Sequence, residues 1–454
     1  MSFLSINPKN ENLIFELNEF SQNDTNEIIN KAYFSHQKWK TVEIEERATF
    51  LSRTADILKN KKEFYAKLIS DEMGKPVSQS AAEVLKCATV CEYYAQNAQN
   101  FLKAEIIESG KLKASISFQP LGIILGIMPW NFPFWQVFRF AVPAIMAGNA
   151  ALLKHAPNVS MCALEIEKIF YEAGFPEDLF RTLIVSVDKV PGIIENSFIQ
   201  GISITGGTIA GKKVAAKAGD CLKKTVLELG GSDPYIIMQD ADLESASESC
   251  VAGRLLNAGQ SCIAAKRFIV HQDIYKNFLE MFTEKMKQKT YGDPLENYDL
   301  GPLARKDLRD NIHELVSGSV LKGAKLLTGG KIPDMKGYFY PPTVLAEVTT
   351  DMPVWREETF GPAAAVIKYS TDDEAVKLAN DTEYGLGAAI FSRNIEKAQK
   401  IAENQINAGS CVINDFVKSD PRLPFGGIKE SGYGRELSLF GIREFVNIKT
   451  IVFN

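Results

Sequence analysis

Apolar positions recur along the chain with two different spacings, which predict two kinds of element. Residues 25–60 and 61–104 repeat apolar positions every three to four residues between charged ones, the pattern of amphipathic helices. Short β-branched and aromatic runs then flank Ser109 and Gly110, which predicts a hairpin leading into a buried strand. The first part of the chain is therefore expected to be helical and to end in a hairpin.

Short apolar runs alternate with helical patterns in the rest of the chain. Strands are expected at "NAALLKH", "RTLIVS" and "IQGISITGG", and helices over 160–174 and 209–218. A second series runs from "TVLELGGSDPYIIM" to about residue 415. Such alternation is typical of βαβ units and parallel sheets. The tail "FVNIKTIVFN" predicts a terminal strand without a nearby partner, and such an edge is usually covered, often by another subunit.

Composition places the chain among ordinary soluble globular proteins. Its 454 residues suggest two or three domains, and a formal net charge of −5 gives no general basic surface, so no nucleic-acid partner is expected. The start "MSFLSINPKNENLIFELNEF" lacks a cationic leader followed by an apolar run. Seven cysteines without a CxxC or zinc-like spacing indicate a reduced protein. We expect a cytoplasmic location and no bound metal.

Residues 121–153 resemble a membrane span, because Arg139 is their only charged residue. Three prolines (Pro129, Pro133 and Pro143) interrupt the run, so no continuous apolar helix of about 20 residues remains. A buried strand, a loop and a packed helix that begins near Pro133 are expected here, with no membrane partner.

The stretch "NAGQSCIAAKR" (257–267) contains the first candidate for chemistry, Cys262. A nucleophilic thiolate needs access, a polar surrounding and a backbone N–H for the oxyanion that it creates. A Gly-Gln-Ser-Cys turn entering a helix can supply all three. On the residues alone, a small residue at a helix start is the commoner explanation of such a cysteine.

Two further side chains could complete an acyl-transfer site. Glu228, at the end of an apolar run before two glycines, could serve as a general base whose pKa burial raises, or it could be an exposed acid at a strand end. Asn131, among aromatics and prolines, could polarise a carbonyl oxygen or could cap the following helix. The glycines of "SITGGTIAGKK" (203–213) suit a pyrophosphate at a helix N-terminus, although they do not complete the dinucleotide fingerprint.

Together these pieces resemble the aldehyde dehydrogenase superfamily essentially from end to end. The motifs, in the order of the family, are "PWNFP" (129–133), "LLKHAP" (152–157), "ITGGTIAG" (204–211), "LELGG" (227–231), "GQSC" (259–262), "EETFGP" (357–362) and "PFGGIKESGYGRE" (424–436). Within the superfamily, "LLKHAPN", "LELGGSDP", "GQSCIAAKRFIV" and "GRELSLFGIREFVNIKT" are most similar to bacterial succinate-semialdehyde dehydrogenases.

The resemblance implies a role for each matching residue. Cys262 would be the nucleophile, Asn131 and the Cys262 N–H would hold the oxyanion, and Glu228 would activate the water that cleaves the thioester. The cofactor would be NADP or NAD. Its implied contacts are Trp130, Lys154 at the adenosine ribose, Pro157, Gly206 and Gly207 at the pyrophosphate, Glu358 at the nicotinamide ribose, and Phe360 at the nicotinamide.

Departures from the family pattern bear on the cofactor. Many NAD-using relatives carry a glutamate where this chain has Pro157, and the usual "KP" and "TGS" read Lys154-His155 and Thr205-Gly206-Gly207. A carboxylate at position 157 would repel a 2′-phosphate, which Pro157 cannot do. NADP is therefore expected to be accepted, alone or alongside NAD. Relatives that form acyl-CoA commonly lack the glutamate that is present here as Glu228, which argues for hydrolysis to the free acid.

Arg139 is the candidate for substrate recognition. A guanidinium in so apolar a run needs an anionic partner, either a substrate carboxylate or an acid elsewhere in the chain. The resemblance implies the first, with help from Ser419, and adds Trp135 to the substrate contacts. A second arginine of many such relatives is Leu256 here, so the grip on the carboxylate would be looser. The expected substrate is a small aldehyde with a distal carboxylate, most of all succinate semialdehyde.

The fold implied is α/β: an atypical Rossmann cofactor domain (1–104 and 122–228), a catalytic α/β domain (229–418) and a small β oligomerisation arm (105–121 and 437–454), with 419–436 returning to the cofactor domain. A homodimer or a homotetramer would follow from the arm. The alternatives to this reading are a broader-specificity or other semialdehyde dehydrogenase, a cofactor-independent cysteine hydrolase, and a non-enzymatic scaffold.

Overall fold

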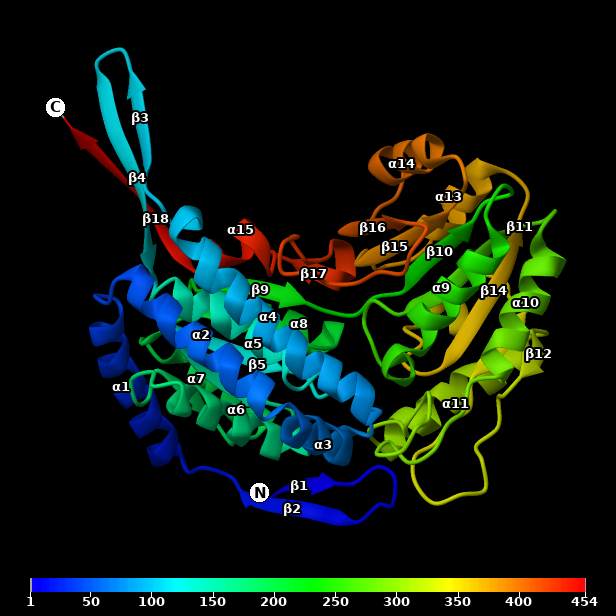
Figure 1. The fold of residues 1–454 in the computed structure, drawn as a ribbon, viewed down its shortest axis with the longest axis horizontal. Coiled ribbons are helices and arrows are strands. Elements are labelled where there is room, and N and C mark those ends of the chain that lie inside the picture. The colour runs from blue at the N-terminus through cyan, green and yellow to red at the C-terminus, as the bar shows by residue number, and fades with distance from the viewer. Residues whose placement is uncertain (1, 454) are drawn as a thin grey trace.

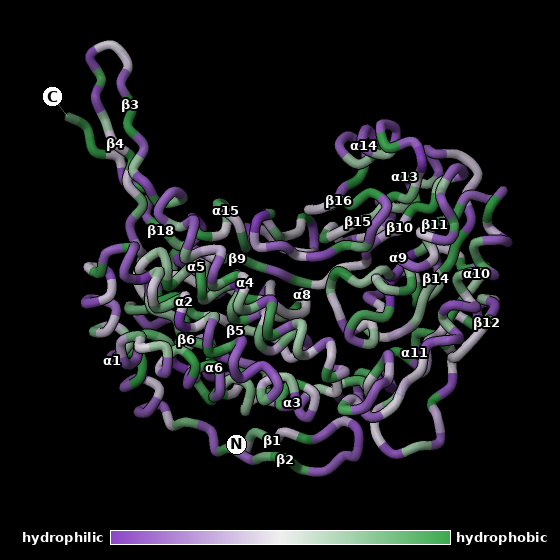
Figure 2. The backbone as a smooth tube through the Cα atoms, in the orientation of Figure 1, coloured by the Kyte–Doolittle hydropathy of each residue, from purple (hydrophilic) through white to green (hydrophobic). Residues whose placement is uncertain are grey.

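Two twisted sheets, each flanked by helices, lie side by side, and a narrow β arm stands out beyond one of them (Figure 1). This architecture comes from a computed structural model that describes residues 2–453. The expected domain bounds at residues 1 and 454 lie outside the described residues. Apolar stretches of the chain concentrate in the interior of both bodies, along their strands (Figure 2).

The first sheet has the strand order β17-β9-β8-β5-β6-β7, in which β17 alone is antiparallel to its neighbour. Most residues of its central strands are buried, as expected for a parallel sheet covered on both faces. The strands are β5 (Ile123–Met128), β6 (Ala150–His155), β7 (Phe180–Thr182), β8 (Ile199–Thr205), β9 (Lys224–Glu228) and β17 (Gly432–Tyr433).

Eight α-helices accompany this sheet among the described residues, and α5 is buried along its whole length, as expected for the packed helix after the proline-rich loop. It begins at Trp135, slightly later than the expected start near Pro133. The helices are α1 (Gln22–Trp39), α2 (Ile44–Asn60), α3 (Lys62–Met73), α4 (Val77–Phe101), α5 (Trp135–Met146), α6 (Ser160–Glu172), α7 (Val190–Glu195) and α8 (Thr208–Asp220), joined by the 3₁₀ turns η1 (Pro157–Val159) and η2 (Val187–Lys189).

The second sheet has the order β12-β13-β14-β11-β10-β15-β16 and is parallel except for its edge strand β12. Its strands are β10 (Asp233–Ile237), β11 (Ala265–His271), β12 (Lys325–Thr328), β13 (Thr343–Ala346), β14 (Ala363–Tyr369), β15 (Gly387–Phe391) and β16 (Ser410–Ile413). Its helices are α9 (Leu243–Leu255), η3 (Leu256–Gly259), α10 (Tyr275–Lys287), α11 (Lys306–Leu321), α12 (Pro353–Arg356), α13 (Asp372–Asn380) and α14 (Ile395–Asn404).

The arm is a three-stranded antiparallel sheet with the order β18-β4-β3. The strands β3 (Glu105–Ser109) and β4 (Leu112–Pro120) form the predicted hairpin, and β18 (Val446–Phe453) pairs with β4 along its whole length. The terminal strand thus finds a partner within its own chain. The short elements η4 (Lys429–Ser431) and α15 (Ser438–Ile442) precede it.

One element pair was not predicted from the sequence. The strands β1 (Ser2–Ile6) and β2 (Leu13–Asn18) form an antiparallel hairpin that runs beneath the first body (Figure 1). In residues 2–453, no helix is both long enough and apolar enough to cross a membrane. Cys87 and Cys91, four residues apart on α4, are buried side chains of the core.

Candidate active site

Cys262 lies in a turn at the junction of the two bodies. The turn follows η3 and leads into strand β11, so the expectation that it enters a helix is wrong. Cys262 is half-buried and lines a cavity of about 160 Å³, together with side chains from α4, α5 and the segment 417–425. The thiol therefore has the access that a nucleophile needs.

The backbone before Cys262 is unusual. Asn257, Ala258 and Gly259 follow one another in the left-handed region, with φ of 54°, 52° and 75°. This conformation costs energy for non-glycine residues and persists where surrounding contacts stabilise it. At Gly259 a Cβ atom would lie 2.3 Å from the Gly361 carbonyl oxygen, so only glycine fits. Beyond the turn, Lys266 Nζ donates to the carbonyl oxygens of Ser261 (3.0 Å) and Cys262 (2.7 Å).

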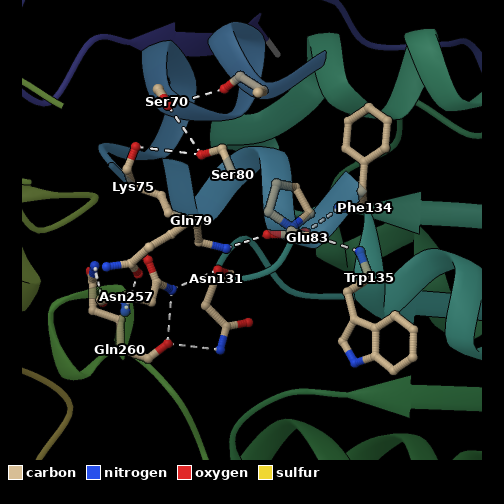
Figure 3. A network of polar contacts seen from close by, with 12 residues as sticks. Ser70, Lys75, Gln79, Ser80, Glu83, Asn131, Phe134, Trp135, Asn257 and Gln260 are labelled. Atoms are coloured by element: carbon tan, nitrogen blue, oxygen red, sulfur yellow. Dashed lines mark hydrogen bonds and ion pairs between the residues drawn. The ribbon is translucent and has the colours of Figure 1, made fainter. Parts of the chain in front are cut away.

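Asn131 is tied directly to this turn. Its Nδ2 donates to the Gln260 carbonyl oxygen (3.1 Å), and Asn257 Nδ2 donates to the Asn131 carbonyl oxygen (2.7 Å) (Figure 3). Because an amide nitrogen carries two hydrogens, one N–H of Asn131 is left for another acceptor. Among the described residues the Cys262 N–H also has no acceptor. The two donors expected for an oxyanion are thus both free of competing bonds.

The start of α5 shows that Asn131 does not cap this helix. The backbone N–H groups of Phe134 and Trp135 donate instead to Glu83 Oε1, at 2.9 and 3.0 Å (Figure 3). Glu83, on α4, also forms a buried ion pair with Lys75. A carboxylate at a helix N-terminus satisfies N–H groups that have no partner within the helix. Glu83 thereby fixes the segment that carries Asn131.

Glu228 ends strand β9 and is buried, not exposed as the alternative reading supposed. Within residues 2–453 neither of its carboxylate oxygens has a hydrogen-bond partner. Burial raises its pKa well above the usual range, the nearby Arg139 opposes this rise, and Glu436 adds to it. A Cβ at Gly426 would lie 2.7 Å from Glu228 Oε1, so a larger residue there would press on the carboxyl group. These properties suit a general base.

The thiol of Cys262 is protonated at rest. Burial raises the pKa of Cys262 to about 12, while Arg139 and Lys266 oppose the rise. Each of the four histidines has a ring nitrogen in a hydrogen bond with another group. The partners are Gly148 for His36, Pro133 for His155, Asp273 for His271 and Tyr340 for His313. The ring nitrogens of the histidines therefore have other partners, and Glu228 is close enough to raise the pKa of the thiol.

The residues implied for a cofactor gather at the carboxyl ends of the parallel strands of the first sheet. Lys154 lies near the end of β6, Gly206 follows β8, and Gly207 is the N-cap of α8. Space around Gly207 is open, since a Cβ there would meet no atom within 4 Å. In an open α/β sheet this edge is where nucleotides bind.

Lys154 adds a positive charge without a carboxylate partner among the described residues. Its Nζ donates to the His155 carbonyl oxygen (3.2 Å), and burial lowers its pKa. A cation at this edge of the sheet fits the phosphates or ribose of a dinucleotide. Pro157 is exposed and begins η1 close by. Burial also lowers the pKa of His155 to about 4, so this ring is neutral and joins β6 to the Pro133 carbonyl oxygen at 2.9 Å.

The residues implied for the nicotinamide end lie at the second body. Glu358 accepts from the Gly231 N–H (3.0 Å) and lies 3.5 Å from Lys266 Nζ. The rings of Phe360 and Trp130 meet edge to face, with centroids 5.8 Å apart. Glu358 is linked through Lys266 to the Cys262 carbonyl, which places this end of the cofactor region beside the nucleophile turn.

Arg139 lines the cavity. Its anionic partner, which the sequence could not identify, is an acid of the same chain. Its guanidinium forms a buried ion pair with Glu436 and donates to Thr205 Oγ1 at 3.3 Å. The same group lies 4.6 Å from the centroid of the Phe425 ring. Trp135 and Ser419 also line the cavity, and both contact Lys86. A role of Arg139 toward substrate stays a prediction, because its charge is already balanced.

Sequence reasoning missed four residues that shape this site: Glu83, Lys86, Asn257 and Lys266. Asn257 and Lys266 flank the cysteine motif, and their polar character in an apolar surrounding was a usable signal. Glu83 and Lys86 lie on a helical run with charged positions throughout, so their burial could not be read from spacing alone.

The model of the aldehyde dehydrogenase family matches residues 1–451. "Probable succinate-semialdehyde dehydrogenase [NADP(+)]" of Synechocystis is 44% identical over 452 residues, covering 99% of each chain. "Succinate-semialdehyde dehydrogenase [NADP(+)]" of Mycobacterium leprae is 44% identical over 455 residues, again covering 99% of each. The crystal structure of succinic semialdehyde dehydrogenase from Streptococcus pyogenes with NADP+ is 36% identical, covers 99% of both chains and has a TM-score of 0.97. This chain belongs to the aldehyde dehydrogenase family.

Proposed function

We propose that this protein oxidises succinate semialdehyde to succinate and accepts NADP+ as oxidant, with or without NAD+ alongside. One observation carries the chemistry: the amide of Asn131 is bonded to the turn of Cys262 at a cavity that the thiol lines. The names of the two curated relatives support the substrate and the cofactor.

The residues of this chain divide the reaction into two steps. The Cys262 thiol would lose its proton to solvent as its sulfur bonds to the aldehyde carbon, and the free N–H of Asn131 with the Cys262 N–H would stabilise the oxyanion of the thiohemiacetal. A bound nicotinamide would accept the hydride whose loss turns the thiohemiacetal into a thioester. Glu228 would then take a proton from water, whose oxygen bonds to the acyl carbon as the carbon–sulfur bond breaks.

The proposed cofactor contacts follow the geometry of the strand ends. Lys154 would bind the adenosine ribose or its 2′-phosphate, Gly206 and Gly207 the pyrophosphate, and Trp130, Glu358 and Phe360 the nicotinamide end. Pro157 leaves room for a 2′-phosphate that a carboxylate would repel.

The proposed substrate contacts are the side chains of Arg139, Trp135 and Ser419, all of which line the cavity with Cys262. The arm supports a homodimer or homotetramer, because its outer strands β3 and β18 keep one open edge each among the described residues. We also propose that the protein works in the cytoplasm, since its cysteines are all free in the structure.

The function is tested by following reduced nicotinamide with NADP+ or NAD+ and a panel of aldehydes. Succinate semialdehyde should give a larger kcat/KM than butanal, which has the same chain length without a carboxylate, and Cys262→Ala should give no signal with either. A wild-type enzyme that favours butanal would contradict the substrate assignment. A protein that consumes neither aldehyde with either cofactor would contradict the oxidation itself.

A further inference from the structure

Three cations border the cavity of Cys262, and they differ in how their charge is balanced. Arg139 is paired with Glu436, and Lys418 with Asp415, whose Oδ2 lies 2.8 Å from Lys418 Nζ. Within residues 2–453, Lys86 has no ion-pair partner. Partial burial of an ammonium group without a nearby anion costs free energy. An unpaired, partly buried lysine therefore indicates a site where an anion binds.

The contacts of Lys86 direct it toward the cavity. It projects from α4, its Nζ donates to Ser419 Oγ at 2.7 Å, and it lies 4.3 Å from the centroid of the Trp135 ring. Ser419 and Trp135 come from two other parts of the cavity wall. An ammonium group has three hydrogens, and one of them is used by Ser419, so it can still donate to a carboxylate.

The acidic groups nearest to Lys86 are already occupied. Glu83 accepts from two backbone N–H groups through Oε1, and its Oε2 pairs with Lys75. Asp420 accepts from the Arg422 backbone and guanidinium through both oxygens. Glu436 serves Arg139 and Ser203. Among the described residues, none of these three carboxylates therefore remains to neutralise the lysine.

We propose that Lys86 supplies a second charge, beside that of Arg139, that selects aldehydes with a distal carboxylate. This inference rests on the proposed function and identifies the residue that gives it specificity. The carboxylate would accept a charge-assisted bond from Lys86 Nζ and a second bond from Ser419 Oγ–H. Arg139, whose charge Glu436 balances, would remain a substrate contact and would also keep Glu436 and Thr205 in place.

The pH dependence of selectivity follows from the surroundings of Lys86. Burial, together with the nearby Arg139, lowers the pKa of Lys86 to about 8, against the opposing effects of Cys87, Glu83 and Asp420. As pH rises through about 8, free Lys86 loses its proton and its attraction for a carboxylate. Titration of Cys262 and Glu228 acts on every aldehyde alike, so it cancels in the ratio of kcat/KM for succinate semialdehyde to that for butanal.

The test measures the ratio of kcat/KM for succinate semialdehyde to that for butanal. It uses Lys86→Met, Lys86→Arg and the control Lys418→Met, at pH 7 and at higher pH values. Lys86→Met should lower the ratio at least about tenfold, through a higher KM for succinate semialdehyde, with little change for butanal. Lys86→Arg should restore much of the ratio and should make it insensitive to pH. Lys418→Met, which removes a cation already paired with Asp415, should change the ratio less than about twofold.

The outcomes separate the two proposals. If wild type shows no preference for succinate semialdehyde over butanal, the proposed substrate is wrong. If wild type shows the preference and Lys86→Met keeps it, the role of Lys86 is wrong while the function stands. Equal losses with both aldehydes would also overturn the inference, because they would show that Lys86 only joins α4 to Ser419 and Trp135.

Discussion

On the proposed mechanism, the buried carboxyl group of Glu228 would determine how the second half of the reaction depends on pH. Because burial raises its pKa, more of the group is neutral near pH 7 than for an exposed glutamate, and the fraction present as the base grows as the pH increases. The rate of thioester hydrolysis should therefore rise with pH, while hydride transfer in the first turnover need not follow it.

Glu228→Gln should isolate the first half of the reaction. The variant keeps the size of the side chain but cannot take a proton from water, so it should form about one reduced nicotinamide per site and then turn over slowly. Rapid mixing with succinate semialdehyde measures both phases, and Cys262→Ala, which should show neither, is the control. Steady turnover of Glu228→Gln at the wild-type rate would contradict the assignment.

Position 157 determines, on our proposal, whether a 2′-phosphate is tolerated. Pro157 is exposed next to Lys154, whose charge has no carboxylate partner among the described residues. Pro157→Glu would place a negative charge there, which should repel NADP+ and offer an acceptor to the 2′-hydroxyl of NAD+. The ratio of kcat/KM for NADP+ to that for NAD+ should fall at least about tenfold.

The uncharged variant Pro157→Gln separates charge from the loss of proline. It should change the cofactor ratio much less than Pro157→Glu does, because it keeps the polar side chain without the repulsion. Equal ratios for wild type and Pro157→Glu would show that another residue chooses the cofactor.

At the scale of elements, Glu83 of α4 accepts from the first backbone N–H groups of α5, and its charge is balanced by a buried ion pair with Lys75 (Figure 3). Removing one partner of a buried pair leaves an uncompensated charge and typically costs about 3–5 kcal/mol. Lys75→Met should lower the free energy of unfolding by about this amount, seen as a lower urea midpoint by tryptophan fluorescence.

The double variant Lys75→Met with Glu83→Gln is the matched control for this prediction. It removes both charges, and its glutamine oxygen can still accept from Phe134 and Trp135, so it should lose clearly less stability than Lys75→Met alone. If the two variants were equally unstable, the cost would come from packing and not from the unpaired charge.

The elements and the reactive residues were predictable to different extents. The parallel strands and the hairpin at Ser109 and Gly110 follow from local patterns, and the proposed roles of Cys262 and Glu228 rest on motifs. The backbone at Asn257 does not, because side-chain bonds to Asn131 and Gln260 stabilise its left-handed conformation only after folding. This explains why the turn of Cys262 was expected to enter a helix and leads into β11 instead.

The partners of charged residues are also set by contacts that form only after folding, so the sequence alone does not reveal them. Arg139 needed an anion, but its sequence neighbours could not show that Glu436, far along the chain, is that anion. The sequence around Lys86 did not suggest that it lines the cavity, because a lysine on an amphipathic helix usually faces solvent. Tertiary contacts decide which of two similar cations stays unpaired.

At the scale of the whole molecule, the arm exposes apolar side chains that a monomer would leave in water. Ile448 is 60% exposed and Val452 58% exposed on β18, and Ile106 is 64% exposed on β3. The arm stands away from the body (Figure 1), and the open edges of β3 and β18 offer backbone groups for pairing. A second copy of the chain can cover both the edges and the apolar side chains.

The double variant Ile448→Lys/Val452→Lys should therefore dissociate the oligomer. These two side chains lie on one face of β18, since successive residues of a strand alternate between faces, and two charges there would resist burial in an interface. Light scattering after size exclusion should give a monomer mass, with a far-ultraviolet circular dichroism spectrum like that of wild type. Leu321→Lys, on α11 of the other body and 89% exposed, is the control and should leave the mass unchanged. If the double variant kept the wild-type mass, or if wild type were itself a monomer, the arm would not be the site of assembly.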